Sequence, residues 1–181
     1  GTGTIAQRHL EGLADHSHGR AVAVYDIDAA RSAQTATRFG IAQASSLAAL
    51  LGRSDIDAVI VATPPSAHRE PTLAALAAGK HVLCEKPFAL DPADAAEMVA
   101  AAERAGRHLA CASARFRCPA AARAAQATIA RGDLGTVYYV RSTQLRFRGR
   151  PGHHIFPQSS WFLDRGRAGG GAMMDIAVYQ I

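Results

Sequence analysis

The sequence predicts an α/β fold with a doubly wound parallel sheet, because short apolar runs alternate with longer helical patterns. The runs are apolar along their whole length, which is typical of parallel strands covered on both faces. They are Ala21–Tyr25, Ala58–Ala62, His81–Cys84 and His108–Ala112. The Ala-rich helical patterns are Ile5–Asp15, Ala29–Phe39, Ser66–Ala78 and Pro92–Ala105. Glycines follow three of these helices, at 40, 79 and 106, where a left-handed C-terminal residue is favoured.

The chain is predicted to hold two domains, a nucleotide-binding one over residues 1–115 and the beginning of a second over residues 116–181. A helix over Ala120–Arg131 leads into Thr136–Phe147, a β-rich run longer than the earlier strands. Gly169–Ile181 is predicted to be helical after its three glycines. These segments indicate the start of an α+β substrate domain with an open antiparallel sheet. We expect this domain to be incomplete, because one long strand cannot support such a sheet.

Composition excludes several classes of function. The 181 residues are 49% hydrophobic and lack an eighteen-residue apolar run, so neither a membrane span nor a membrane partner is expected. The net charge is +5, but the basic stretch Arg141–Arg150 carries no nucleic-acid motif. We therefore favour a solvated face or a subunit contact there over phosphate binding. Three cysteines without metal-ligand spacing suit a reducing cytoplasm, and no metal site is predicted.

A glycine turn opens the chain. Gly1-Thr2-Gly3-Thr4-Ile5-Ala6 fits the G-x-G-x-x-G/A pattern of a Rossmann-type dinucleotide site, in which the backbone approaches a pyrophosphate at a helix N-terminus. The alternative is a glycine-rich turn without a ligand. Such a turn normally follows a strand, so we expect the first strand of the sheet to be missing ahead of Gly1.

An acidic residue supports the dinucleotide interpretation. Asp26 ends the apolar run Ala21–Tyr25, twenty residues after Ala6, where a carboxylate accepts hydrogen bonds from the adenosine ribose. A carboxylate there repels a 2′-phosphate, which predicts NAD in preference to NADP, although the nearby Arg31 weakens that preference. The alternative is that Asp26 caps the next helix together with Asp28.

Two further strand ends carry polar groups. The strand ending at Ala62 runs into Thr63 and Pro64, and His68 begins the following helix. The next strand ends in Glu85-Lys86-Pro87, where the proline holds Lys86 extended. Ligands of open α/β sheets bind beyond the carboxyl ends of strands, so these groups are candidate cofactor contacts. A capping or surface histidine at 68, and a surface Lys86 paired with Glu85, are the alternatives.

In this order and spacing the motifs resemble the family of glucose–fructose oxidoreductase, inositol dehydrogenase and dihydrodiol dehydrogenase. The resemblance runs almost end to end, through Arg115-Phe116 to Trp161 and the glycines before Asp175. It implies that Lys86 hydrogen-bonds the substrate oxygen and takes part in proton transfer. It also implies that Glu85 lies near the nicotinamide ribose. Arg115 meets the cofactor or substrate by the same resemblance, with an interdomain ion pair as the alternative.

The resemblance gives roles to Asp175 and Tyr179 as well. They are four residues apart on the predicted terminal helix and would share one face. Tyr179 stands where inositol-dehydrogenase-like members have histidine, and resembles the tyrosine of the glucose–fructose oxidoreductase and dihydrodiol dehydrogenase branch. It would be the proton donor or acceptor, with Asp175 orienting it. Helix-start hydrogen bonding for Asp175 and core packing for Tyr179 are the alternatives.

These residues together predict an NAD(P)-dependent oxidoreductase that moves a hydride between nicotinamide and a sugar, cyclitol or diol hydroxyl carbon. The expected cofactor is NAD, with NADP as the other choice. The expected partner is a small polyol or sugar, and the full-length protein is expected to be a homo-oligomer in the cytoplasm. A dinucleotide-binding regulator without turnover, and an inactive fragment, remain alternatives.

Overall fold

The computed structural model describes residues 1–113, 119–141, 143 and 157–179. The chain divides into two compact units, Gly1–Cys111 and Ala112–Ile181, which are taken one at a time below. Arg115 and Cys118 lie outside the described residues, and so does most of the basic stretch Arg141–Arg150.

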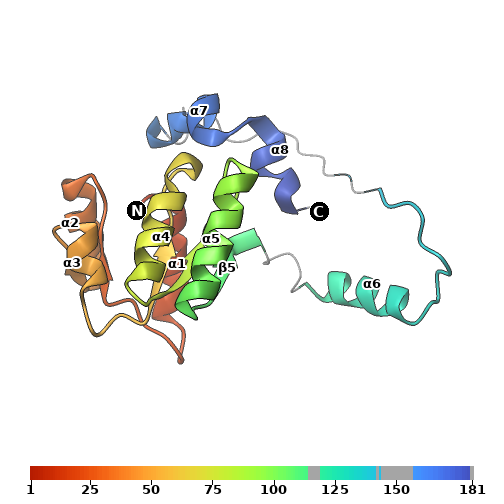
Figure 1. Ribbon diagram of the computed structural model, residues 1–181, viewed down its shortest axis with the longest axis horizontal. Coiled ribbons are helices and arrows are strands. Elements are labelled where there is room, and N and C mark those ends of the chain that lie inside the picture. The colour runs from red at the N-terminus through yellow and green to blue at the C-terminus, as the bar shows by residue number, and fades with distance from the viewer. Residues whose placement is uncertain (114–118, 142, 144–156, 180–181) are drawn as a thin grey trace. The chain divides into compact units, whose positions relative to one another are not determined.

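The first unit contains two parallel sheets. One is the pair β1–β2, and the other has the order β3-β4-β5. The strands are β1 (Ala23–Val24), β2 (Ala42–Gln43), β3 (Ala58–Val61), β4 (His81–Cys84) and β5 (Leu109–Cys111). Figure 1 shows the order of the elements along the chain. The predicted strand positions are confirmed for four of these five strands: β4 has the predicted bounds, and β1, β3 and β5 are shorter than predicted.

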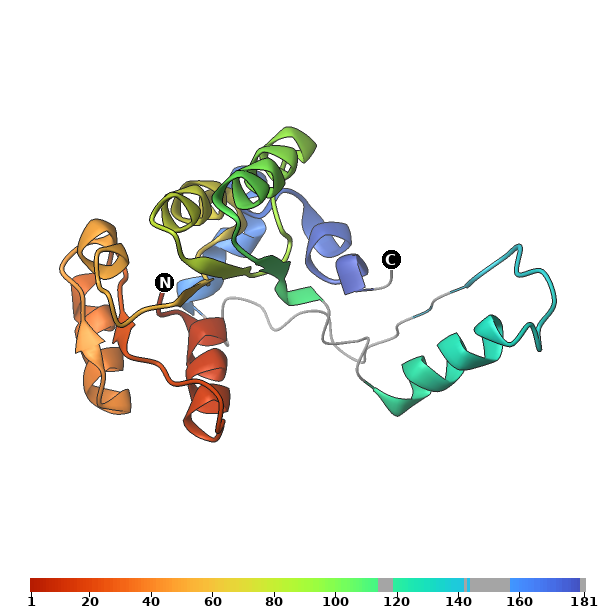
Figure 2. The same cartoon turned by 60° about the horizontal axis from the view of Figure 1, so that its bottom comes forward.

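Helices connect the strands of the first unit and cover both faces of the larger sheet. They are α1 (Thr4–Ala14), α2 (Ala29–Phe39), α3 (Leu47–Leu51), η1 (Pro65–Ala67), α4 (Arg69–Ala77) and α5 (Pro92–Ala105). Figure 2 shows α4 and α5 on one side of β3-β4-β5 and α1 on the other. The helix ends follow local chemistry: Asp91 caps α5, and Gly106 ends it in the left-handed conformation.

Apolar side chains from helices and strands form the core of the first unit. The larger cluster joins Leu76 of α4, Met98 of α5 and Val82 of β4, all at most 3% exposed. A smaller cluster of Leu10, Val24 and Ala36 lies beside β1. Burying each large apolar side chain stabilises the fold by about 1.5–3 kcal/mol. The packed core therefore fixes the positions of the strand ends next to it.

In the first unit two elements were not predicted, and one predicted helix is divided. The strand β2 has two residues and α3 has five, which is shorter than the window over which periodicity can be recognised. The helix predicted over Ser66–Ala78 forms as the 3₁₀ turn η1 followed by α4, with His68 between them.

Gly1 lies between the two sheets at their carboxyl ends. Its amino group donates to the carbonyl of Tyr25 at 2.9 Å, just past β1. A Cβ added to Gly1 would lie 2.4 Å from the carbonyl oxygen of Ala62, just past β3, so only glycine fits there. That the sheet lacks its first strand stays a prediction.

The second unit is helical in its described part. Its elements are α6 (Ala120–Ala130), η3 (Pro157–Leu163), α7 (Arg165–Ala168), α8 (Gly171–Asp175) and η4 (Ala177–Tyr179). The strand predicted from Thr136 is not formed at residues 136–141 or 143, and the rest of that run lies outside the described residues. Tyr138 is 94% exposed and Val140 is 76% exposed. No strand among the described residues pairs with this run, so residues 136–141 have no ladder to join there.

The single terminal helix predicted over Gly169–Ile181 is wrong. The chain forms α8, which ends at Asp175, and then the 3₁₀ turn η4, in which the amide of Tyr179 donates to the carbonyl of Ile176 at 3.1 Å. A 3₁₀ turn has three residues per turn, so residues four apart no longer share a face. No helix in the described part of the chain is long and apolar enough to cross a membrane.

Candidate functional site

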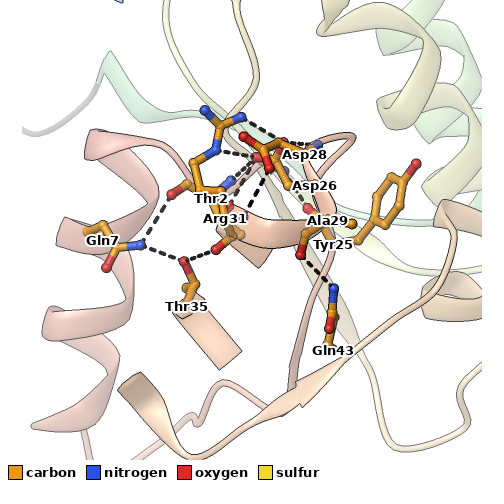
Figure 3. A network of polar contacts seen from close by, with 10 residues as sticks. Thr2, Gln7, Tyr25, Asp26, Asp28, Ala29, Arg31, Thr35 and Gln43 are labelled. Carbon is orange, nitrogen blue, oxygen red and sulfur yellow. Dashed lines mark hydrogen bonds and ion pairs between the residues drawn. The ribbon is translucent and has the colours of Figure 1, made fainter. Parts of the chain in front are cut away.

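A buried carboxylate meets the glycine turn at the end of β1. Asp26, two residues past β1, is 7% exposed. One of its oxygens, Oδ2, accepts hydrogen bonds from the backbone amide of Thr2 at 2.7 Å and from the Thr2 hydroxyl at 3.0 Å. Figure 3 shows these contacts. The turn and the acidic residue that the sequence analysis singled out are therefore in direct contact.

An arginine completes the surroundings of Asp26. The Arg31 guanidinium, from the first turn of α2, donates through Nη2 to Oδ1 at 2.7 Å and through Nε to Oδ2 at 3.3 Å. Burial alone would raise the pKa of Asp26. The hydrogen bonds from Arg31 and from the amides of Asp28 and Thr2 outweigh burial and lower that pKa to about 2. Asp26 is thus ionised at neutral pH, and the capping alternative is wrong for it, because Asp28 caps α2.

The two glycines of the turn have different surroundings. Gly1 has no room for a side chain, whereas a Cβ on Gly3 would meet nothing within 4 Å. Gly3 is the N-cap residue of α1 and offers no side chain to the first amides of that helix. Gln7 holds the turn from within α1 by donating to the carbonyl of Thr2 at 3.2 Å (Figure 3). The open space therefore lies at Gly3, where Thr4 and Ile5 begin the helix and its amides favour an anion.

The turn after β3 is closed on itself. The hydroxyl of Thr63 donates to the carbonyl of Ala67 at 2.8 Å, and the amide of Ala67 donates to the carbonyl of Pro64 at 2.8 Å. These two bonds fix the Thr-Pro-Pro segment at the carboxyl end of the strand. Its position there agrees with the placement that the sequence predicts for Thr63 and Pro64, and their contact with a cofactor stays a prediction.

His68 is fully buried, with 0% of its surface exposed. Its Nδ1 lies 2.9 Å from the carbonyl oxygen of Pro87, and its Nε2 lies 3.0 Å from that of Thr63. The surface alternative is wrong, and of the capping alternative only the position holds: His68 is the N-cap residue of α4, but its side chain makes no capping hydrogen bond. The pKa of His68 is lowered overall because the ring is buried, although the backbone carbonyls and the charge of Glu85 act to raise that pKa. The predicted contact with nicotinamide stays a prediction, although both ring nitrogens already face carbonyls.

Glu85 lies at the end of β4, and both of its carboxylate oxygens are engaged. Oε1 lies 2.8 Å from Nε2 of His9, and Oε2 accepts from the amide of Lys86 at 3.0 Å. Burial raises the pKa of Glu85, but the bonds from His9 and from the Lys86 amide lower it overall. The peptide bond between Lys86 and Pro87 is cis.

His9 belongs to none of the motifs that the sequence shows. It sits three residues after Ala6 and one before Leu10, and these two residues form the buried side of α1. Helix residues three apart share a face, so the periodicity of α1 could have placed His9 toward the sheet. Its partner Glu85 lies 76 residues further along the chain, and no local pattern indicates that pairing.

The structure brings the predicted residues of the first unit into two groups at strand ends. One group contains Gly1, Thr2 and Asp26, and the other contains His68, Glu85 and the backbone of Lys86. Asp175 and Tyr179 belong to the second unit. Their convergence with Lys86, and the role of Arg115, stay predictions. The described residues hold no group of three His, Cys, Asp or Glu side chains suited to a metal.

Comparison with family models identifies both units. Residues 1–113 match the oxidoreductase family with an NAD-binding Rossmann fold, and residues 122–181 match the GFO/IDH/MocA C-terminal domain. The chain belongs to this oxidoreductase family. The match confirms the α/β fold class and the resemblance that the motifs predict.

Individual relatives agree with the family. The chain is 41% identical to 1,5-anhydro-D-fructose reductase of Ensifer adhaerens over 180 residues, 99% of this chain and 52% of that protein. It is 43% identical to inositol 2-dehydrogenase 3 of Saccharopolyspora erythraea over 100 residues, 55% of this chain and 30% of that protein. The crystal structure of an NAD-binding protein from Listeria innocua superposes with a TM-score of 0.84 at 27% identity, covering 99% of this chain and 50% of that one. The chain spans about half the length of the reductase.

Proposed function

We propose that this chain forms the cofactor-binding part of an NAD(P)-dependent oxidoreductase that acts on a sugar, cyclitol or diol hydroxyl. The observation that carries the proposal is the contact of the glycine turn with the buried, ionised Asp26 at the ends of parallel strands. A turn, a helix N-terminus and a carboxylate in that arrangement provide for a pyrophosphate and a ribose together. The relatives named as a sugar reductase and an inositol dehydrogenase support the substrate class.

The residues fit a dinucleotide. The open space at Gly3 and the first amides of α1, from Thr4 and Ile5, suit the pyrophosphate, and Gly1 and Thr2 shape the turn. Asp26, which follows β1, suits the adenosine ribose. Thr63 and Pro64, which follow β3, belong to the proposed cofactor site as well. We propose NAD as the preferred cofactor because Asp26 is ionised. Arg31, whose side chain is 38% exposed, offers a cation beside it that moderates the repulsion of a 2′-phosphate.

The catalytic roles follow from the chemistry of three side chains. The nicotinamide supplies hydride transfer when the cofactor is bound. We propose that Lys86 hydrogen-bonds the substrate oxygen, that Tyr179 accepts or donates the proton, and that Asp175 orients it. The domain assignment 1–115 and 116–181, a cytoplasmic location, and a homo-oligomer in the full-length protein belong to the same proposal.

Paired glycine substitutions test cofactor binding. Gly3→Ala places a methyl group in the space proposed for the pyrophosphate, with no protein atom within 4 Å. We expect NAD affinity by calorimetry to fall at least about tenfold, while the thermal midpoint falls by only a few degrees, because alanine is a poorer N-cap residue than glycine. Gly12→Ala, in the same helix and also without a neighbour within 4 Å, is the matched control and should leave NAD affinity unchanged.

Equal NAD affinity in the Gly3→Ala variant would contradict the pyrophosphate placement. A search for NADH formation over aldoses, inositols and vicinal diols then tests the activity. Tight NAD binding without turnover of any member of that panel would favour the regulator alternative over the enzyme.

A further inference from the structure

The backbone around Lys86 is held from both sides. On its N-terminal side the Lys86 amide donates to Oε2 of Glu85 at 3.0 Å. On its C-terminal side the carbonyl of Pro87 lies 2.9 Å from Nδ1 of His68. Both contacts fix the backbone from which the lysine side chain begins.

Each of the two holding side chains is buried and anchored to another element. Glu85 is 6% exposed and is fixed by His9 of α1 at 2.8 Å. His68 is 0% exposed, and its second nitrogen lies 3.0 Å from the carbonyl of Thr63, in the closed turn after β3. The segment after β4 is thereby tied to α1 on one side and to the end of β3 on the other.

We propose that His68 and Glu85 are positioning residues for Lys86, which hold its backbone instead of touching the cofactor. Their polar atoms hold the backbone on either side of Lys86, Glu85 through the Lys86 amide and His68 through the carbonyl of Pro87. Buried hydrogen bonds of this kind keep their geometry because breaking one leaves an unsatisfied polar group. The inference rests on the proposed function only where it gives Lys86 a role in turnover. The contacts of Glu85 with the Lys86 amide and of His68 with the Pro87 carbonyl are tested by measurements that need no turnover.

The chemistry of the His68 ring makes this inference specific. Both of its partners are carbonyl oxygens, which only accept hydrogen bonds. A neutral imidazole has one N–H and so satisfies one of the two carbonyls, whereas a protonated ring satisfies both. Holding the Pro87 carbonyl requires a proton on Nδ1. That requirement can be read directly from the nitrogen chemical shifts of the histidine ring in the unmodified protein.

The first measurement is therefore nitrogen NMR of the ¹⁵N-histidine-labelled protein. We expect His68 to carry a proton on Nδ1 at neutral pH. A bare Nδ1, with the proton on Nε2 alone, would overturn the His68 contact with Pro87. This measurement needs no variant and no cofactor, so it decides the matter even if the substitutions below do not fold.

The second measurement is hydrogen exchange at the Lys86 amide. His68→Phe keeps a ring but removes both nitrogens, and we expect exchange at Lys86 to become at least about tenfold faster. His81→Phe is the matched control. His81 is the first residue of β4, at the end of that strand away from Lys86, and its Nδ1 accepts a hydrogen bond from the amide of His108. Unchanged exchange in His68→Phe, or the same increase in both variants, would overturn the proposal.

Binding and kinetics separate positioning from cofactor contact. For His68→Phe we expect kcat to fall at least about tenfold while the Kd for NAD stays within about twofold of the unmodified protein. Weaker NAD binding in step with kcat would instead make His68 a cofactor contact. Glu85→Gln, which keeps an oxygen for the Lys86 amide, should retain more kcat than Glu85→Leu. If the protein turns over nothing, the proposed function fails while the exchange and NMR results still decide this inference.

Discussion

The surroundings of Asp26 and Glu85 differ although both are buried carboxylates beyond the ends of parallel strands. Asp26 is paired with Arg31, which stays charged at every pH of interest, and it accepts from Thr2 and Asp28 besides. Glu85 is paired with His9, which is charged only when protonated, and with one amide. Arg31 is 38% exposed and His9 is 23% exposed in their side chains.

The difference separates two uses of the same chemical group. The Asp26 site is firmly ionised, and its partner Arg31 is more exposed than His9, the partner of Glu85, although the Asp26 side chain itself is only 4% exposed. The Glu85 site is closed by protein groups and fixes the segment that carries Lys86. Four predictions test this contrast, from the largest effect on stability or affinity to the smallest.

Removing the Asp26 carboxylate should have the largest effect. Asp26→Ala leaves the Arg31 guanidinium and the Thr2 amide without their acceptor. We expect the free energy of unfolding, measured by urea denaturation, to fall by about 3 kcal/mol, the low end for broken buried pairs because Arg31 is partly exposed. Asp55→Ala is the control: the Arg53–Asp55 pair is exposed, so the urea midpoint should not move. A similar midpoint in both variants would contradict the buried pair.

Acid should destabilise the first unit through the same carboxylate. The pKa of Asp26 is lowered from 3.8 to about 2 in the folded state, so its contribution is complete above about pH 4 and is lost as the pH falls through about 2. That contribution is about 2 kcal/mol. Glu85 adds to the loss in the same direction, because its pKa is also lowered. Stability curves of Asp26→Asn should be flatter between pH 4 and 2, and an equally steep curve would refute the assignment.

Neutralising Glu85 should cost less than removing Asp26. Glu85→Gln keeps an acceptor for the Lys86 amide and loses only the charge toward His9, so we expect a fall of about 1 kcal/mol in the free energy of unfolding. Urea denaturation at pH 6 and pH 8 gives the measurement. A loss as large as that of Asp26→Ala would show that the two carboxylates are not used differently.

Truncating Arg31 should change cofactor choice modestly. Arg31→Ala removes the cation that neutralises Asp26, so the carboxylate should repel a 2′-phosphate more strongly. We expect the ratio of NADP to NAD dissociation constants to rise about threefold, less than 1 kcal/mol. Arg38→Ala, in the same helix and bound to Glu11 instead, is the control. A fall in the ratio of NADP to NAD dissociation constants would contradict the proposed place of Arg31 at the ribose site.

Local sequence patterns predicted most of the first unit correctly. The apolar runs predicted β1, β3, β4 and β5, and the helical patterns with the glycines that follow them predicted α2 and α5 to the residue. These features depend on contacts within a few residues of one another. The pattern failed at β2 and α3, which are short, and at the terminal helix, where the chain tightens into the 3₁₀ turn η4 after Asp175.

The sequence by itself determined the family, the glycine turn and the acidic residue that follows it, because each is a local pattern with fixed spacing. Only the tertiary structure decided which groups satisfy one another: Arg31 on Asp26, His9 on Glu85, and His68 between two carbonyls. The physical reason is that a buried polar group must find a partner wherever the fold provides one, and the His9–Glu85 partners lie 76 residues apart in the chain.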